Sequence, residues 1–92
     1  MNGFPVIGNG YRAEVKVDGQ HLRLFSEVYM LGHVAVVFDV NAKREIARHD
    51  VENLDIGKLQ AEKSAANYLK YVLGIIAMPA VEWQMNVQPR PR

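Results

Sequence analysis

The stretch HVAVVFDV, residues 33–40, is apolar at six of its eight positions. Its apolar side chains fall on both faces of a strand, so we predict a strand inside a sheet with a cover on each side. A helix predicted over residues 54–73 supplies one cover. The sequence identifies no element for the other face, and that face is therefore the main candidate for a functional surface.

A hairpin is predicted ahead of this central strand. Residues 11–17 alternate strictly between apolar and charged side chains, which is typical of a strand with one buried face. Asp18-Gly19 is a strong signal for a two-residue turn, because both positions of such a turn need a positive φ. The turn pairs residues 11–17 with a second strand over residues 20–29.

The next loop determines which side chains of the central strand face the helix. Residues 30–32, MLG, fit a three-residue loop with glycine in the left-handed position, which pairs Tyr29 with His33. That register brings Leu24 opposite Phe38. It also turns the odd-numbered residues of the central strand away from the helix, onto an outer face.

A fourth strand is predicted over residues 43–51, at the edge of the sheet. We choose the register that pairs Asp39 with Arg44, because the alternative places Arg48 and Asp50 on the buried face. The chosen register sets two further pairs on the outer face: Val37 with Ile46, and His33 with Asp50.

The rest of the chain predicts a helix and a fifth strand. Residues 54–73 have helical periodicity, with Asp55 as N-cap and Gly74 as the stop. Residues 81–87 alternate, and their inward side chains are Val81, Trp83, Met85 and Val87. The direction of this strand allows antiparallel pairing with the first strand, of the same chain or of another chain. Parallel pairing beside the fourth strand is the alternative.

The expected fold is α+β, with the element order ββββαβ and an antiparallel sheet of strand order 5-1-2-3-4. Residues 11–87 form its single domain, between a flexible N-terminal arm of residues 1–10 and a polar C-terminal tail of residues 88–92. The 92 residues, 49% of them hydrophobic and 23% charged, suffice for one two-layer core.

Composition excludes several classes of protein. The absence of cysteine excludes disulfides, thiolate nucleophiles and thiolate metal ligands. The chain opens on no secretory leader and has no run long enough to span a membrane, so we expect a cytoplasmic protein. The formal net charge is only +1, and two of the basic residues, Arg90 and Arg92, lie in the tail. Because duplex-binding domains carry a clear basic excess, nucleic acid is not the expected partner.

No catalytic, cofactor-binding or metal-binding site is predicted. His33, Asp50 and Tyr29 come together in the chosen register and resemble part of a catalytic dyad. We interpret them as a polar cross-strand cluster, because no serine is placed to act as the nucleophile. His21 lies too far from His33 to share a metal, and the chain has no phosphate-binding loop. We therefore expect a non-enzymatic protein without cofactor or small-molecule substrate.

The outer face of the predicted sheet carries an apolar stripe with charged residues around it. We predict that five residues of this face bind a partner: Phe25, Tyr29, Ala35, Val37 and Ile46. The expected partner is a second copy of the chain, bound face to face or by exchange of the C-terminal strand.

Two other interpretations of the outer face stay open. In the first, the N-terminal arm folds over the stripe through Phe4, Val6 and Ile7. In the second, the face binds single-stranded nucleic acid, with bases stacked on aromatic side chains and phosphates beside four arginines: Arg12, Arg23, Arg44 and Arg48.

Overall fold

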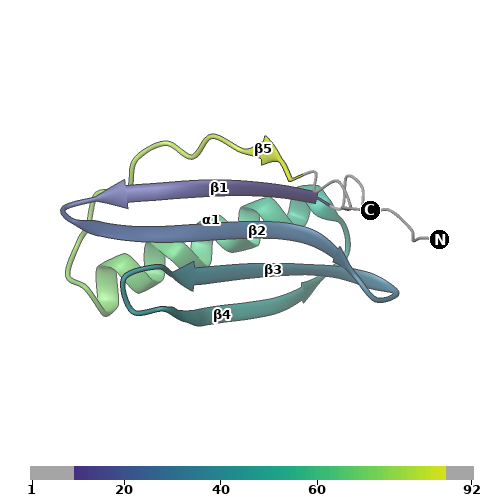
Figure 1. Ribbon diagram of the computed structural model, residues 1–92, viewed down its shortest axis with the longest axis horizontal. Coiled ribbons are helices and arrows are strands. Elements are labelled where there is room, and N and C mark those ends of the chain that lie inside the picture. Colours follow the sequence, from purple (N-terminus) through teal and green to yellow (C-terminus); the bar gives the residue numbers. More distant parts are fainter. Residues whose placement is uncertain (1–9, 87–92) are drawn as a thin grey trace, which may run out of the picture.

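The computed structural model describes residues 10–86, which form a five-strand antiparallel sheet with one helix on one face (Figure 1). The elements are β1 (Gly10–Val17), β2 (Gln20–Tyr29), β3 (Gly32–Asp39), β4 (Arg44–Val51), α1 (Leu54–Tyr71) and β5 (Gln84–Met85). The strand order β4-β3-β2-β1-β5 confirms the predicted α+β fold and topology. The predicted arm, up to residue 9, and the end of the chain from Val87 lie outside the described residues. Within residues 10–86, no helix combines the length and the apolar character that crossing a membrane requires.

The first hairpin has the predicted turn and register. Asp18 and Gly19 have φ values of 49° and 79°, which suit a two-residue turn with positive φ at both central positions. Val17 pairs with Gln20, and the pairing continues without interruption to Gly10. The alternation of β1 therefore places one set of side chains under α1 and the other set on the outer face.

The predicted loop between β2 and β3 is wrong by one residue. The strands are joined by a two-residue turn, so Tyr29 pairs with Gly32 and Leu24 pairs with Val37. The residue with the positive φ in this turn is Met30, at 56°, whereas the predicted three-residue loop had Gly32 in that conformation. Because side chains alternate along a strand, this shift turns every side chain of β3 to the opposite face from the one predicted.

The surroundings of Asp39 show how the structure accommodates this register. Asp39 lies on the helix side of the sheet and is only 3% exposed. Its carboxylate accepts hydrogen bonds from the Tyr68 hydroxyl (2.6 Å) and the Ala42 N–H (3.0 Å). Burial raises the pKa of this carboxyl, but the hydrogen bonds from Tyr68 and the backbone outweigh it and hold the pKa below its ordinary value. The predicted register kept Asp39 in solvent, whereas the fold buries it with partners.

Strand β4 contains a bulge that the sequence did not reveal. Asp39 pairs with Arg44, as predicted, but Val37 pairs with Ala47 instead of Ile46. The register shifts between Val37 and Phe38, so Ile46 is the extra residue of the bulge. Ile46 packs against the core on the helix side, where it is partly buried.

The N-cap of helix α1 differs from the predicted one. The Asn53 side chain accepts a hydrogen bond from the Ile56 N–H (2.9 Å), so Asn53 is the N-cap and the assignment of Asp55 is wrong. Gly74 follows the helix with φ 74°, in agreement with its predicted role as the stop. The residues that α1 buries against the sheet are Gly57, Ala61, Ala65 and Leu69.

The helix approaches the sheet most closely at Gly57. Ser26 is fully buried below it on β2, and its hydroxyl donates to the Leu54 carbonyl (2.7 Å). A Cβ atom at Gly57 would lie 2.2 Å from the Ser26 Oγ and 3.3 Å from Val51 Cγ2. Only glycine therefore fits between the first turn of α1 and the sheet.

Strand β5 is shorter than predicted. Gln84 and Met85 pair antiparallel with β1 of the same chain, which confirms the preferred neighbour, whereas Val81 and Trp83 lie outside the ladder. Trp83 is partly buried against the core and donates from Nε1 to Glu62 (2.8 Å). Met85 is 64% exposed, contrary to the prediction, because α1 packs over the other four strands and not over β5.

The contact at Gly57 generates a test of helix docking. Gly57→Ala should lower the free energy of unfolding by about 1–3 kcal/mol, because overpacking strains the core by more than the helix propensity of alanine gains. Urea titration of both proteins measures the change.

A second substitution identifies the source of that strain. Ser26→Ala removes the oxygen that lies closest to the added methyl group. The cost of Gly57→Ala should therefore be smaller in a Ser26→Ala background than in the unmutated protein. Equal costs in the two backgrounds would show that Ser26 is not the obstacle.

The bond between Tyr68 and Asp39 predicts a pH-dependent contribution to stability. Tyr68→Phe should cost about 1.5–3 kcal/mol at neutral pH, because it removes a hydrogen bond to a buried charged group. Tyr71→Phe is the matched control, since Tyr71 is 73% exposed near the same helix end.

The sign of the pH dependence follows from the lowered pKa of Asp39. A carboxyl whose pKa is lower in the folded state stabilises the protein fully above its ordinary pKa of 3.8 and loses that contribution as pH falls through the folded value. The difference in stability between Tyr68→Phe and the unmutated protein should shrink on acidification below about pH 4. A difference that grows towards acid would contradict the assignment.

Candidate functional site on the outer face of the sheet

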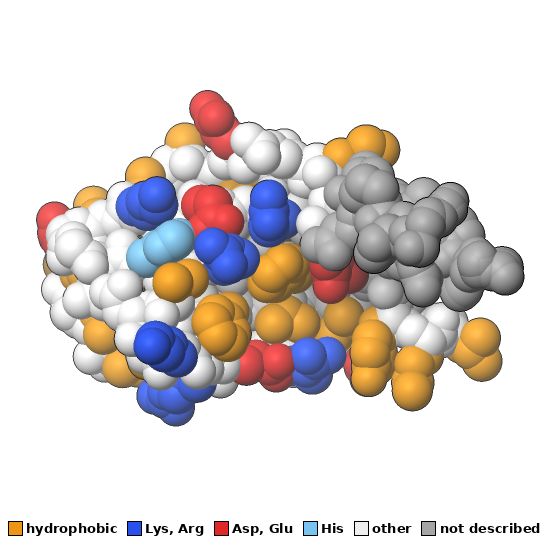
Figure 2. All heavy atoms as spheres, viewed as in Figure 1, with side chains coloured by type: hydrophobic (Ala, Val, Ile, Leu, Met, Phe, Trp, Pro, Cys, Tyr) orange, Lys and Arg blue, Asp and Glu red, His pale blue; other side chains and the backbone are white. Residues whose placement is uncertain are grey.

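The outer face is the side of the sheet that points away from α1. Its centre holds four apolar side chains, which we call the outer strip: Phe25 from β2, and Val34, Val36 and Phe38 from β3. Figure 2 looks onto this face and shows hydrophobic side chains gathered across its middle, bordered by charged side chains. The outer strip is apolar along the full length of β3, whereas a solvated sheet face normally alternates with polar residues.

The members of the outer strip differ in exposure. Val34 is 3% and Val36 is 8% exposed, while Phe25 and Phe38 are partly buried. Phe25 lies directly opposite Val36 in the ladder between β2 and β3, so the aromatic ring can cover the smaller side chain. The two phenylalanines therefore carry most of the apolar surface that the strip still presents to solvent.

Two of the five predicted partner-binding residues lie on this face and three do not. Phe25 and Tyr29 point outward from β2. Ala35 and Val37 belong to the core under α1, where Val37 is 0% exposed, and Ile46 packs against the same core. The two-residue β2–β3 turn gives β3 the opposite facing from the predicted one, which accounts for Ala35 and Val37. The bulge in β4 places Ile46 on the helix side.

Three members of the outer strip were not predicted from the sequence: Val34, Val36 and Phe38. The missing information was the length of the β2–β3 turn, because a two-residue turn places these side chains outward. The two-residue turn consists of Met30 and Leu31, and neither residue type favours a positive φ. The sequence therefore favoured the longer loop, in which Gly32 takes the positive φ. Alternation was only a weak guide, because apolar side chains lie on both faces of β3.

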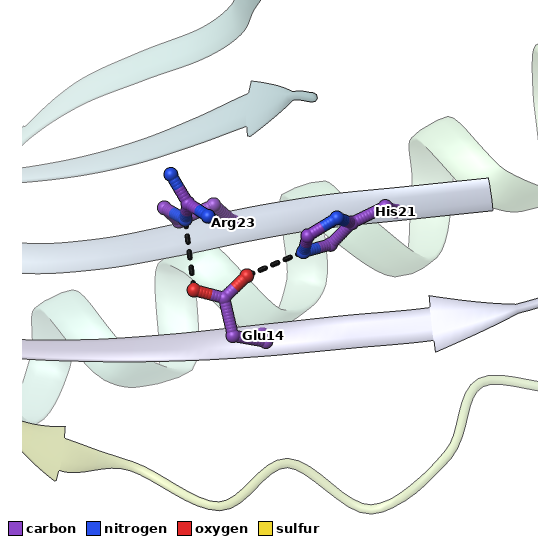
Figure 3. Close-up of polar contacts among 3 residues, drawn as sticks. All are labelled: Glu14, His21 and Arg23. Atoms are coloured by element: carbon purple, nitrogen blue, oxygen red, sulfur yellow. Dashed lines mark hydrogen bonds and ion pairs between the residues drawn. The ribbon is translucent and has the colours of Figure 1, made fainter. Parts of the chain in front are cut away.

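A charged network borders the outer strip on the side of β1. Glu14 lies between two partners on β2: it accepts hydrogen bonds from His21 Nε2 (2.5 Å) and from Arg23 Nε (2.8 Å), as Figure 3 shows. Glu14 and Arg23 are direct neighbours across the ladder, and Arg23 is in turn opposite Phe38. The network therefore adjoins the apolar strip.

The environment of Glu14 favours its charged form. Partial burial raises the pKa of this carboxyl, but the hydrogen bonds and charges of His21 and Arg23 lower it by more, so the pKa lies below its ordinary value. The Arg23 guanidinium is consequently engaged by a carboxylate over most of the pH range. Its availability for a phosphate group is reduced accordingly.

A second ion pair borders the strip on the side of β4. Arg48 donates to both carboxylate oxygens of Glu45 (2.8 and 2.9 Å). The Arg48 guanidinium also lies 5.6 Å from the centre of the Tyr29 ring, in a cation–π contact. Arg48 is directly opposite Val36, so this pair flanks the centre of the outer strip.

The four arginines of the nucleic-acid interpretation do not share one surface. Arg12, Arg23 and Arg48 lie on the outer face, and the latter two form ion pairs with carboxylates. Arg44 lies towards the helix side, where its charge acts on Asp39 and Tyr68. The arrangement gives a phosphate chain no continuous row of cations.

The predicted cluster of His33, Asp50 and Tyr29 does not form. His33 pairs with Val51 and Asp50 pairs with Val34, so the histidine and the carboxylate belong to opposite faces of the sheet. Within the described part of the chain, no three His, Asp or Glu side chains come close enough to share a metal ion.

Comparisons with protein-family models, with curated proteins and with solved structures gave no match to this chain. The function therefore has to be inferred from the residues of the outer face themselves.

The Glu14 network yields a prediction that NMR can check. In the unmutated protein the side-chain carboxyl of Glu14 should titrate below its ordinary pKa of 4.5. Arg23→Gln removes a hydrogen-bond donor and a positive charge, so the Glu14 pKa should rise. An unchanged midpoint in the variant would show that Arg23 does not act on this carboxyl.

Proposed function

We propose that this chain is a non-enzymatic interaction module that associates with a second copy of itself through the outer strip. The proposal is carried by one observation: β3 places Val34, Val36 and Phe38 on a face that no described element covers, and Phe38 together with Phe25 supplies the apolar surface of the strip that is still open to solvent. The same strand is apolar on its helix side, where Ala35 and Val37 are buried. A strand with two apolar sides is suited to a position between two layers.

A second copy supplies the missing layer with the right geometry. Two sheets can pack face to face about 10 Å apart, and each then covers the apolar side of the other. Four strands of about eight residues present roughly 500 Å² of sheet, so a pair would bury about 1,000 Å² in total, the lower end for a specific interface. The α1 helices would lie on the outside of this sandwich.

The energetics favour a weak association. Val34 and Val36 are already buried in the single chain, so the new burial comes mainly from Phe25 and Phe38. Full burial of a phenylalanine contributes about 1.5–3 kcal/mol, and these rings are already partly covered. Four such rings in a dimer, each at most about one-third exposed, would contribute no more than about 4 kcal/mol, which only matches the association cost of at least about 4 kcal/mol. Dimers at high micromolar concentrations therefore need further burial on this face, and Tyr29, which is 53% exposed there, is available for it.

The charges of the outer face favour a protein partner over a nucleic acid. Glu14 and Glu45 neutralise Arg23 and Arg48 beside the strip, and the whole chain has a formal net charge of only +1. Nucleic-acid affinity depends on unpaired cations that neutralise phosphates. An apolar centre with ion-paired borders is closer to the anatomy of a protein interface.

A pair of adjacent substitutions tests the proposal. Phe38→Gln changes a partly buried side chain of the outer strip and should shift the protein to monomer without unfolding it. Val37→Gln, one residue earlier on the same strand, places an amide in the core under α1 and should instead lower stability by several kcal/mol. Sedimentation equilibrium between about 10 µM and about 500 µM measures association, and urea titration measures stability.

Two results would contradict self-association through the strip. One is an unmutated protein that stays monomeric up to about 500 µM, which would show that burial of the two phenylalanines and Tyr29 does not outweigh the cost of association. The other is a dimer that Phe38→Gln leaves unchanged. A labelled single-stranded oligonucleotide that binds at low salt and loses affinity steeply with added salt would favour the nucleic-acid interpretation.

A further inference from the structure

Strand β4 forms an open border of the sheet. It is the last strand of the order β4-β3-β2-β1-β5, and no other described element lies beyond it (Figure 1). At the opposite border, β1 is paired over part of its length by β5. The free backbone groups of an edge strand are a template for another strand, so β4 is the position at which this sheet can be extended.

The hydrogen-bond pattern shows which backbone groups of β4 are free. The Val40 N–H donates to the His21 carbonyl (2.9 Å), so even-numbered residues of β3 direct their N–H and C=O groups towards β2. Odd-numbered residues of β3 consequently bond to β4. Their partners in β4 include Ala47 and His49, which leaves the backbone groups of Arg48 and Asp50 directed outward.

The bulge is confined to the first half of β4. Its register shift lies between Val37 and Phe38 of β3, whereas the pairing from Ala47 to Val51 is regular. Bulges and charges normally protect an edge from unwanted pairing, and the bulge at Ile46 protects that half. The regular second half carries Arg48 and Asp50, which have opposite charges and occupy the same face.

We propose that β4 pairs antiparallel with β4 of a second copy, about a two-fold axis at His49. In this register Arg48 lies opposite Asp50 of the second copy, and the symmetry repeats the pair on the other side of the axis. Both residues direct their backbone groups outward, so each pair can exchange two backbone hydrogen bonds. The opposite charges of their side chains lie next to each other across the new ladder.

The neighbouring registers are disfavoured by the same charges. A shift in one direction places Arg48 opposite Arg48 of the second copy, and a shift in the other direction places Asp50 opposite Asp50. Like charges directly across a ladder are destabilising. Charge therefore selects a single register, which is how a polar edge can be specific for its own copy.

The side chains on the helix side suit the same register. Ala47 lies opposite Val51 of the second copy, and both are partly buried in the single chain. Arg48 uses two N–H groups for Glu45, and its guanidinium has further N–H groups for the Asp50 of the second copy. The pairing consequently needs no break in the ion pairs that the single chain already forms.

Edge pairing goes beyond the proposed function and does not require it. It would join two sheets side by side, whereas the outer strip joins them face to face. A continuous sheet across two copies would place two outer strips on one extended face. That doubled face would bury about twice the area of a single one against another pair, so the two contacts would reinforce each other.

A charge exchange within β4 tests the register. Asp50→Arg places an arginine opposite Arg48 of the second copy at both symmetric positions, and should weaken association through the edge about tenfold. The double variant Arg48→Asp and Asp50→Arg restores opposite charges across the axis and should recover the association. A double variant as weak as Asp50→Arg, or a single variant as strong as the unmutated protein, would overturn the proposal.

A cysteine at the axis gives an independent readout. Residues 49 of the two copies would form a non-hydrogen-bonded pair, with Cα atoms about 4.5 Å apart, within the range of a disulfide. The chain contains no other cysteine, so His49→Cys should give a disulfide-linked dimer under mild oxidation. Lys43→Cys, exposed in the turn before β4 and away from the axis, should cross-link far more slowly. Equal rates for the two variants would overturn the proposal.

The experiments separate edge pairing from association through the outer strip. Edge pairing predicts sensitivity to Asp50→Arg, and the outer strip predicts sensitivity to Phe38→Gln. Association that responds only to Phe38→Gln would reject the edge and keep the strip, and the reverse response would reject the strip and keep the edge. A protein that is monomeric at all concentrations and forms no His49→Cys dimer would reject both.

Discussion

The register of the central strand depends on the hydrogen bond from Tyr68 to the Asp39 carboxylate, which makes burial of this charge possible. An unpaired carboxylate on the helix side would cost several kcal/mol, and the register that places it there would then be unfavourable. The Tyr68 hydroxyl and the Ala42 N–H satisfy the carboxylate instead. With Asp39 held under α1, Ala35 and Val37 form the core and Val36 and Phe38 face outward.

The arrangement leaves the sheet with two surfaces that are unusual for a solvated single domain. One is the apolar outer strip, and the other is the regular half of the β4 edge. Both belong to or adjoin β3, the most buried strand. The outer strip can pack against another sheet, and the β4 edge can pair with another strand. A second copy of the chain can supply both.

Several ionisable groups of the outer face are engaged with one another. Glu14 binds His21 and Arg23, and Glu45 binds Arg48. Exposed pairs of this kind contribute little to stability, typically less than about 1 kcal/mol each. Their larger effect is on specificity, because they leave few free cations for phosphate groups and surround an apolar centre with neutralised borders.

Local patterns in the sequence determined much of the fold. The first hairpin could be predicted with its register, because Asp18-Gly19 favours the turn and the alternation of β1 has one polar side. Strand directions and the helix between them also sufficed for the sheet order, and Gly74 correctly indicated where the helix stops. The turn and the end of the helix depend on neighbours within a few residues, so the sequence contains the information for them directly.

Only the tertiary structure decided which face of β3 is the outer one. Alternation carries little information in a strand with apolar side chains on both sides. The face of β3 that lies under α1 is the one with Asp39, although the opposite face, with Val34, Val36 and Phe38, is the more apolar. The choice depends on Tyr68, which lies 29 residues beyond Asp39, and on the fit of Gly57 over Ser26. The bulge that turns Ile46 inward is a contact of the same kind. Of the five residues predicted for the candidate site, only Phe25 and Tyr29 therefore lie on the outer face, because the facing of the other three depends on contacts between distant parts of the chain.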